Sequence, residues 1–138
     1  MIWRRILGVI AGLLLVVVLV TAAEGIAHVM YPPPPGTNMR NMAAVKEYVA
    51  TLPVTALVIV LAGWSLGTLV GTSTAARIGR SVVPAYVLGV VVLAGGINNA
   101  IQIPQPPWFT TASFVIFIGM TIFGARLGTI NAGTTIPA

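Results

Sequence analysis

Glu24 and His28 are the two side chains whose types and spacing most directly suggest chemistry. They lie four residues apart, so on a helix both would face the same side. The chain has no other histidine, and no other acidic residue falls within an apolar stretch. An ionisable residue inside a membrane segment is a candidate for ligand, ion or proton binding. Glu24 and His28 are therefore the first candidates for a functional site.

Three amide side chains are expected at the same membrane level as this pair, namely Asn98, Asn99 and Gln102. Two glycines, Gly95 and Gly96, precede them and would allow a backbone or a ligand to approach closely. We therefore expect a polar pocket at the outer end of the protein, formed by Glu24, His28, Asn98, Asn99 and Gln102. Two alternatives are that Glu24 is hydrated near the interface, or that these groups link helices through hydrogen bonds worth about 0.6–2 kcal/mol.

The elements that must position these residues follow from the composition. The 138 residues are 57% hydrophobic and 7% charged, whereas a soluble domain carries about 25% charged residues. Four apolar stretches approach the roughly 20 residues that a membrane helix needs: 6–30, 53–74, 84–103 and 109–125. Strands of a membrane β-barrel alternate in polarity and are about half as long. We therefore expect an all-α protein, a single domain with four membrane helices in an up-down bundle.

The distribution of cations predicts the orientation of this bundle. Most of the Lys and Arg residues fall on one side of the predicted membrane: Arg4, Arg5, Arg77, Arg80 and Arg126. Arg40 and Lys46 fall on the other side. Cytoplasmic loops carry such an excess, so both termini are expected in the cytoplasm, beneath a bacterial inner membrane. The same rule accounts for the net charge of +5, and no nucleic-acid partner is expected.

Two segments outside the spans have contrasting patterns. The outer segment 31–52 begins with prolines 32–35, which end a helix and favour extended polyproline II. From residue 42 onward, apolar side chains recur at spacings of three and four, with Lys46 and Glu47 on the opposite side. This pattern predicts a short amphipathic helix on the outer membrane surface. Residues 127–138 are mostly small and polar, and we expect a flexible tail there.

The second span carries a stripe of glycines, Gly63, Gly67 and Gly71, at intervals of four residues. Such a stripe lets two helices pack closely, either within the chain or between two copies of it. Packing within the chain is the stronger expectation, because a four-helix bundle needs such a groove internally. Trp64 lies within the stripe and Trp108 lies at the predicted outer interface. Both rings could stack on a flat ligand, although packing is the more common use of a tryptophan in a span.

Enzymatic chemistry finds little support in the sequence. The chain has no cysteine, which excludes disulfides, iron–sulfur clusters and a catalytic thiol. It has no nucleophile elbow, phosphate-binding glycine loop, pair of catalytic carboxylates or zinc signature. We therefore expect no enzyme activity, no metal site and no cofactor. Met39 and Met42 near His28 could hold a soft metal, but they equally well supply the apolar contacts of an interfacial helix.

Several short motifs along most of the chain resemble a group of small uncharacterised bacterial four-span membrane proteins. These motifs are AAEGIAH at 22–28, YPPPPG at 31–36, LP at 52–53, GWSLG at 63–67, NN at 98–99 and PWF at 107–109. The size, the four spans and the pair Ala23-Glu24 are also similar to the small multidrug resistance transporters. That likeness implies proton exchange at Glu24, although Glu24 lies nearer the end of its span and the outer loop here is longer.

Three functions are compatible with these patterns. The first is an accessory or scaffold protein that packs against itself or a larger membrane complex through its glycine and proline features. The second is a proton-coupled transporter or channel that uses Glu24. The third is a binder of a lipid, quinone or pigment in the outer pocket, which would lose its ligand when Asn98 is replaced by leucine. Lipid contact is common to all three, and a homo-oligomer or a larger complex is the expected assembly.

Overall fold

The computed structural model describes residues 1–132 and contains five helices within them. In chain order they are α1 (Ile2–Met30), α2 (Met42–Ala50), α3 (Val54–Gly79), α4 (Val83–Gln102) and α5 (Pro107–Asn131). Residues 1–132 contain no strand. All helices except α2 are long and apolar enough to cross a membrane. The expected all-α class with four membrane-length helices is therefore confirmed.

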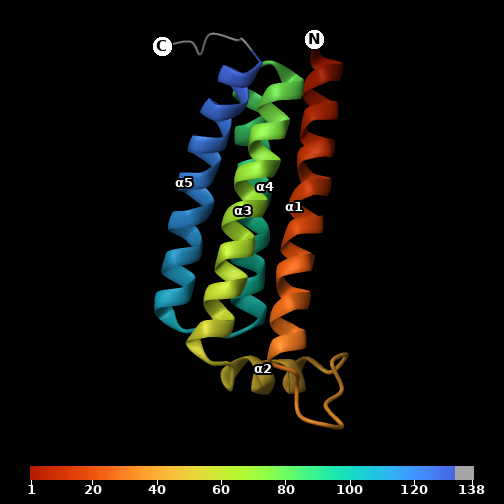
Figure 1. Ribbon diagram of the computed structural model, residues 1–138, viewed down its shortest axis with the longest axis vertical. Helices are drawn as coiled ribbons and strands as arrows, with labels where there is room; N and C mark the ends of the chain where they lie inside the picture. Colours follow the sequence, from red (N-terminus) through yellow and green to blue (C-terminus); the bar gives the residue numbers. More distant parts are fainter. Residues whose placement is uncertain (133–138) are drawn as a thin grey trace.

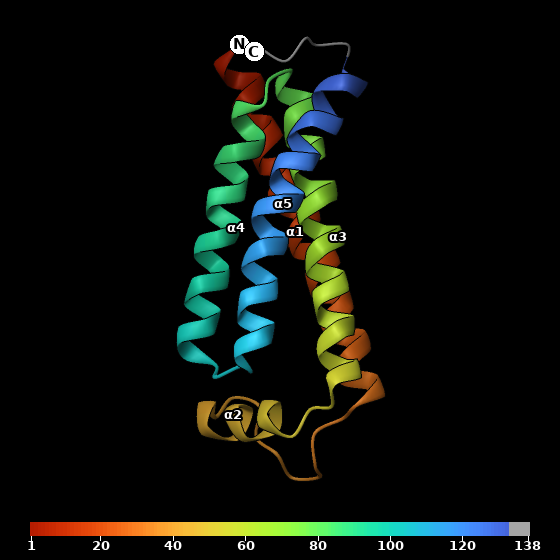
Figure 2. The same cartoon turned by 90° about the vertical axis from the view of Figure 1, so that its left-hand side faces the viewer.

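The four long helices lie side by side and alternate in direction (Figure 1). The start of α1 and the end of α5 lie at one end of the bundle, here called the basic end because Arg4, Arg5, Arg77, Arg80 and Arg126 lie there. At the opposite end, α2 runs across the bundle rather than along it, and Figure 2 shows it beneath the hairpin of α4 and α5. This opposite end is called the roofed end below. The position of α2 at a membrane surface stays a prediction.

Local sequence signals account for the boundaries of these helices. The Asn41 side chain accepts a hydrogen bond of 3.0 Å from the Ala43 amide, which caps the start of α2. Pro107 opens α5, where the missing amide donor carries no cost. At its other end α5 runs to Asn131, into the segment predicted as a tail. Gly128 explains this extension, because it packs so closely on α3 that an added Cβ would overlap the Ser73 carbonyl oxygen. The remainder of that tail, 133–138, lies outside the described residues.

The glycine stripe of α3 faces α1, and the two helices pack closely along it. A Cβ on Gly71 would lie 2.7 Å from the Gly12 carbonyl oxygen, and one on Gly12 would lie 2.5 Å from that of Gly71. A Cβ on Gly63 would overlap Ala23 of α1, and one on Gly67 would lie 3.3 Å from Val20. These distances leave no room for a side chain. The stripe is therefore occupied within the chain.

An aromatic cluster fills the roofed half of the bundle. Trp64 of α3 is only 7% exposed and packs between two rings of α5. Its ring centre lies 5.4 Å from that of Phe109, edge to face, and 5.6 Å from that of Phe117, nearly parallel. Leu57 and Leu61 complete this core. The indole is thereby held in one orientation beside the candidate site.

Candidate functional site: two cavities that meet at Glu24

Glu24 is held against α3 by the tryptophan that the aromatic cluster fixes. The indole Nε1 of Trp64 donates a hydrogen bond of 3.2 Å to the Glu24 Oε1. This bond engages one carboxylate oxygen, whereas an ionised carboxylate can accept several hydrogen bonds. Trp64 lies about 15 Å along α3 from Val54, and Glu24 lies about 9 Å along α1 from Met30, at about 1.5 Å per residue. The pair therefore lies well inside the roofed half of the bundle.

The first cavity lies between this pair and α2, and it is called the polar cavity. Its volume is about 220 Å³. The polar side chains on its wall are Glu24, His28, Tyr48, Trp64, Asn99 and Gln105. His28 meets the Tyr48 ring edge to face, with centres 6.0 Å apart, so α1 and α2 close one side together. The polar cavity is thus a roofed space whose otherwise largely apolar wall carries an acid, an imidazole and two amides.

The second cavity lies between α1 and α4, and it is called the lateral cavity. Its volume is about 340 Å³, and most of its wall is aliphatic, from side chains such as Val16, Val20 and Val92. Leu13 and Val91 border it and are exposed on the sides of α1 and α4 that a membrane would cover. The lateral cavity therefore opens at the apolar side surface of the bundle. Glu24, Trp64 and Asn99 line both cavities and mark the point where they meet.

The structure brings together some of the expected site residues and separates others. Glu24, His28 and Asn99 share the polar cavity. Asn98 and Gln102 are exposed on another side of α4, where the Gln102 Nε2 donates to the Asn98 Oδ1 at 3.0 Å. The expected pocket therefore includes Asn99 without these two amides, because adjacent residues of a helix point about 100° apart.

Gly95 and Gly96 of α4 differ in their surroundings, and Trp108 lies apart from both cavities. Gly95 and Gly96 both line the lateral cavity, and a Cβ on Gly96 would lie 2.5 Å from the Phe117 ring, whereas Gly95 has open space. Trp108 is 43% exposed, packs edge to face on Phe109, and is not among the side chains that line the polar or the lateral cavity. Of the two rings considered for ligand stacking, only Trp64 lines the polar and lateral cavities.

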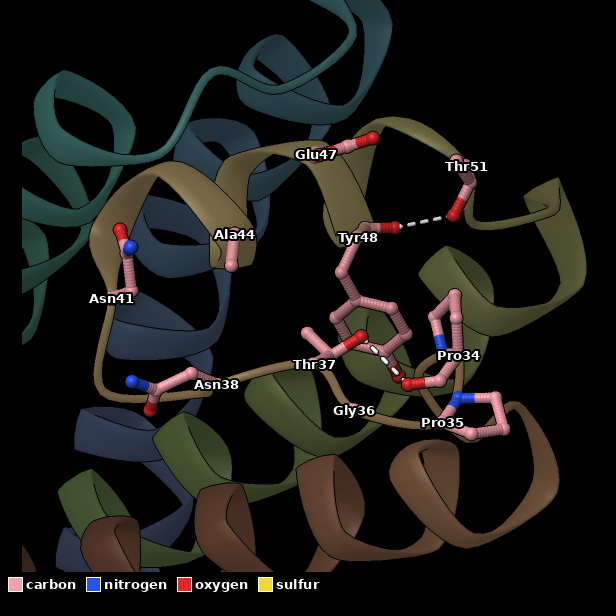
Figure 3. Close-up of a pocket in the computed structure, with 10 residues that line it drawn as sticks. All are labelled: Pro34, Pro35, Gly36, Thr37, Asn38, Asn41, Ala44, Glu47, Tyr48 and Thr51. Carbon is pink, nitrogen blue, oxygen red and sulfur yellow. Dashed lines mark hydrogen bonds between the residues drawn. The ribbon is translucent and has the colours of Figure 1, made fainter.

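Tyr48 is the site residue that the sequence analysis did not single out. Its hydroxyl donates a 2.6 Å hydrogen bond to the Tyr31 carbonyl oxygen, which ties α2 to the end of α1. Figure 3 shows its ring pointing from α2 toward Pro34 and the loop, into a surface hollow of about 440 Å³. Tyr48 also lines the polar cavity, so it lies between that cavity and the outer hollow. The apolar spacing that predicts α2 places Tyr48 on the same face as Val45 and Val49, and this signal could have identified it.

Replacing Tyr48 with phenylalanine should loosen the roof while the ring remains. Loss of one hydrogen bond, worth about 0.5–1.5 kcal/mol net, should speed amide hydrogen exchange in α2 by roughly 2–10-fold. Hydrogen exchange measured by mass spectrometry on peptides covering 42–50 tests this. Tyr86→Phe removes a hydroxyl from an exposed ring of α4 and should leave α2 unchanged. Equal exchange in the wild type and Tyr48→Phe would contradict the tie between α2 and α1.

The hydrogen bond from the Tyr48 hydroxyl to the Tyr31 carbonyl oxygen should weaken at high pH. Burial raises the pKa of Tyr48 above its ordinary value of 10.0. The neutral phenol therefore contributes its full stabilisation below pH 10.0, and this contribution is lost as the pH rises through the higher value of the folded chain. At such high pH, amide hydrogen exchange in α2 of the wild type should accelerate by more than the intrinsic effect of pH. The additional acceleration should be smaller in Tyr48→Phe.

The comparisons with known proteins add no relative to this description. No protein-family model, no curated protein and no solved structure matches the chain. Within residues 1–132 no three His, Cys, Asp or Glu side chains gather as they would around a metal ion. The polar groups that line the polar cavity are one carboxylate, one imidazole, one phenol, one indole and the two amides of Asn99 and Gln105.

Proposed function

We propose that this chain is a bacterial inner-membrane protein that binds an amphipathic small molecule, such as a lipid, a quinone or a pigment, at its roofed end. One observation carries the proposal: the lateral cavity, which opens at the apolar side surface of the bundle, ends at the polar side chains of Glu24 and Asn99. An amphipathic molecule has the complementary arrangement, with an apolar body and a polar end. It would lie with its body between α1 and α4 and its polar end at these two side chains.

The dimensions and polarity of the site support this occupant. The lateral cavity, at about 340 Å³, falls within the roughly 300–1,000 Å³ of small-molecule sites. Such sites are mostly apolar with a few polar groups that orient the ligand. Glu24 lies about 9 Å from the end of α1, so a charge there costs less than the about 2.5–3.5 kcal/mol that it would cost at the centre of a bilayer. A ligand group that donates a hydrogen bond to Glu24 would offset part of that cost.

The accessory or scaffold hypothesis loses one of its two supports. It required the glycine stripe as a docking face, but an added Cβ on Gly63 or Gly71 would run into α1. The proline-rich loop remains as its other support. Proton-coupled transport would use the same carboxylate. A proton path between the polar cavity and the outer hollow would pass Tyr48, which lines both, and would need that side chain to move. Binding requires no such movement, so it is the function that this geometry supports best.

Neighbouring asparagines of α4 provide a matched test of ligand binding. The wild type should retain a small molecule when it is extracted gently from its host membrane and weighed by native mass spectrometry. Asn99→Leu and Glu24→Gln should lower the retained fraction by about tenfold or more, the effect of one hydrogen bond to a charged group. Asn98→Leu makes the same substitution one residue away, on an exposed side of the helix, and should retain the molecule.

Two results would contradict the proposal. One is a wild-type protein that carries no molecule and takes up none when it is reconstituted with total lipid extract from its host. The other is equal retention by Asn98→Leu and Asn99→Leu. The fluorescence of Trp64 gives an independent readout in a variant with Trp3→Phe and Trp108→Phe, since the chain has three tryptophans. Its emission should change when the extract is added, and Glu24→Gln should reduce that change.

A further inference from the structure

The basic end of the bundle carries a groove with a charged rim, which is separate from the two cavities at the roofed end. The groove lies between α1 and α4 and has a volume of about 300 Å³. Its wall is apolar and is formed by Ile6, Val9, Ile10, Val83, Pro84 and Val87. Arg5 is the one charged residue on this wall, and it lies at the end of the groove nearest the chain start. The apolar wall suits an acyl chain, and the positive charge of Arg5 at the rim suits an anionic group.

Further positive charge surrounds this rim. A Cβ on Gly79 would lie 3.5 Å from the Arg5 Cα, which places the turn between α3 and α4 directly beside Arg5. That turn contains Arg80, whose φ of 50° lies in the left-handed region where glycine is the unstrained choice. Arg4 directly precedes Arg5 in the chain, and its Nε donates a hydrogen bond of 3.3 Å to the Ile78 carbonyl oxygen. Three arginine residues therefore lie at one corner of the bundle.

No acidic side chain of this chain neutralises that corner. The sequence contains two acidic residues, Glu24 and Glu47, and both lie toward the roofed end. The attraction of basic side chains to an anionic membrane surface is about 1 kcal/mol for each residue near it. Within residues 1–132 this charge therefore has no acidic side chain as a partner, while anionic lipid headgroups at this end of the bundle could supply one.

We infer that the groove between α1 and α4 at the basic end is a binding site for an anionic phospholipid. One acyl chain of the lipid lies along Val9 and Val87, and its phosphate lies at Arg5 beside the turn that contains Arg80. The site differs from a diffuse positive-inside effect, because it requires both the apolar groove and the arginine at its rim. It does not depend on the ligand proposed for the roofed end.

A competition between two lipids tests this inference. The full chain is reconstituted in nanodiscs with equal amounts of phosphatidylglycerol and phosphatidylcholine, and native mass spectrometry counts the lipids that stay bound. The wild type should retain phosphatidylglycerol with a preference of at least about fivefold, the effect of one arginine near the surface. Arg5→Gln should remove most of this preference. Arg126→Gln removes the same charge from an exposed position on α5, outside the groove, and should change the preference by less than Arg5→Gln does.

A second variant separates the groove from its charge. Val87→Trp fills the groove and leaves all arginines in place, so it should lower the amount of phosphatidylglycerol retained. Val87 is exposed at the lipid-facing surface, so the larger side chain should not disturb the core. Three outcomes would overturn the inference: equal retention of the two lipids by the wild type, equal effects of Arg5→Gln and Arg126→Gln, or unchanged retention by Val87→Trp. Circular dichroism on each variant establishes that it is folded before lipids are counted.

Discussion

Replacing Trp64 with alanine should destabilise the bundle by about 3–5 kcal/mol, the usual cost of truncating a buried aromatic ring. The ring is almost fully buried and lies between Phe109 and Phe117, so its loss leaves a cavity in the core of the roofed half. The truncation also removes the hydrogen-bond donor of Glu24. Thermal unfolding followed by circular dichroism in mild detergent should show a lowered midpoint.

Two further substitutions divide this effect into its parts. Trp64→Phe keeps a ring in the cluster and removes the indole donor, so it should cost roughly 1.5–3 kcal/mol from the bond to a charged partner plus a smaller packing term. Trp108→Ala removes a ring of the same size that is 43% exposed, and its cost should be clearly smaller. A loss for Trp108→Ala equal to that for Trp64→Ala would mean that the cluster around Trp64 is not the core.

Gly12→Ala should be the most damaging single-methyl change in α1, with a cost of about 1–3 kcal/mol from overpacking. The added Cβ would lie 2.5 Å from the Gly71 carbonyl oxygen and 2.7 Å from a methyl carbon of Leu88. A backbone oxygen cannot turn away as a flexible side chain can, so α1 and α3 must separate. The free energy of unfolding, measured by titration with sodium dodecyl sulfate, should fall by this amount.

Gly25→Ala is the matched control, because it adds the same methyl group to the same helix. A Cβ on Gly25 meets nothing within 4 Å. Alanine is a better helix former than glycine, so this change should be neutral or stabilise the chain by about 0.5–1 kcal/mol. Similar losses for Gly12→Ala and Gly25→Ala would show that α1 does not pack on the glycine stripe of α3.

The positions of the helices were predictable because the relevant signals are local. A long apolar run determines a span, and the four predicted spans match the observed helices to within a few residues at most ends. Apolar side chains spaced by three and four residues, with charged side chains on the opposite side, also identified the helix now called α2. The end of α5 was missed, because residues 127–131 are weakly apolar and their helix depends on the contact between Gly128 and α3. Contacts between distant segments leave no such local signal.

The candidate site was harder to predict, because it depends on how each helix is rotated about its axis. An apolar span carries little information on that rotation, and Asn98 and Asn99 looked equivalent in the sequence. The packing of α4 on α5 through Gly89 and Gly96 turns Asn99 toward the cavities and leaves Asn98 exposed. The hydrogen bond between Trp64 and Glu24 was missed for a related reason, since the register of α1 against α3 is determined by glycine contacts along both helices.

In the proposed function, the lateral cavity determines which concentration the ligand experiences. The opening of this cavity at Leu13 and Val91 would then face the hydrocarbon phase, whereas Tyr48 lies between the polar cavity and the outer hollow. A ligand that enters from the side equilibrates with the bilayer, so occupancy follows its mole fraction in the lipid and not its molarity in the buffer. Dilution with buffer leaves such a site filled, while fusion with ligand-free vesicles empties it. Affinities for this protein are therefore comparable only at equal ratios of lipid to protein.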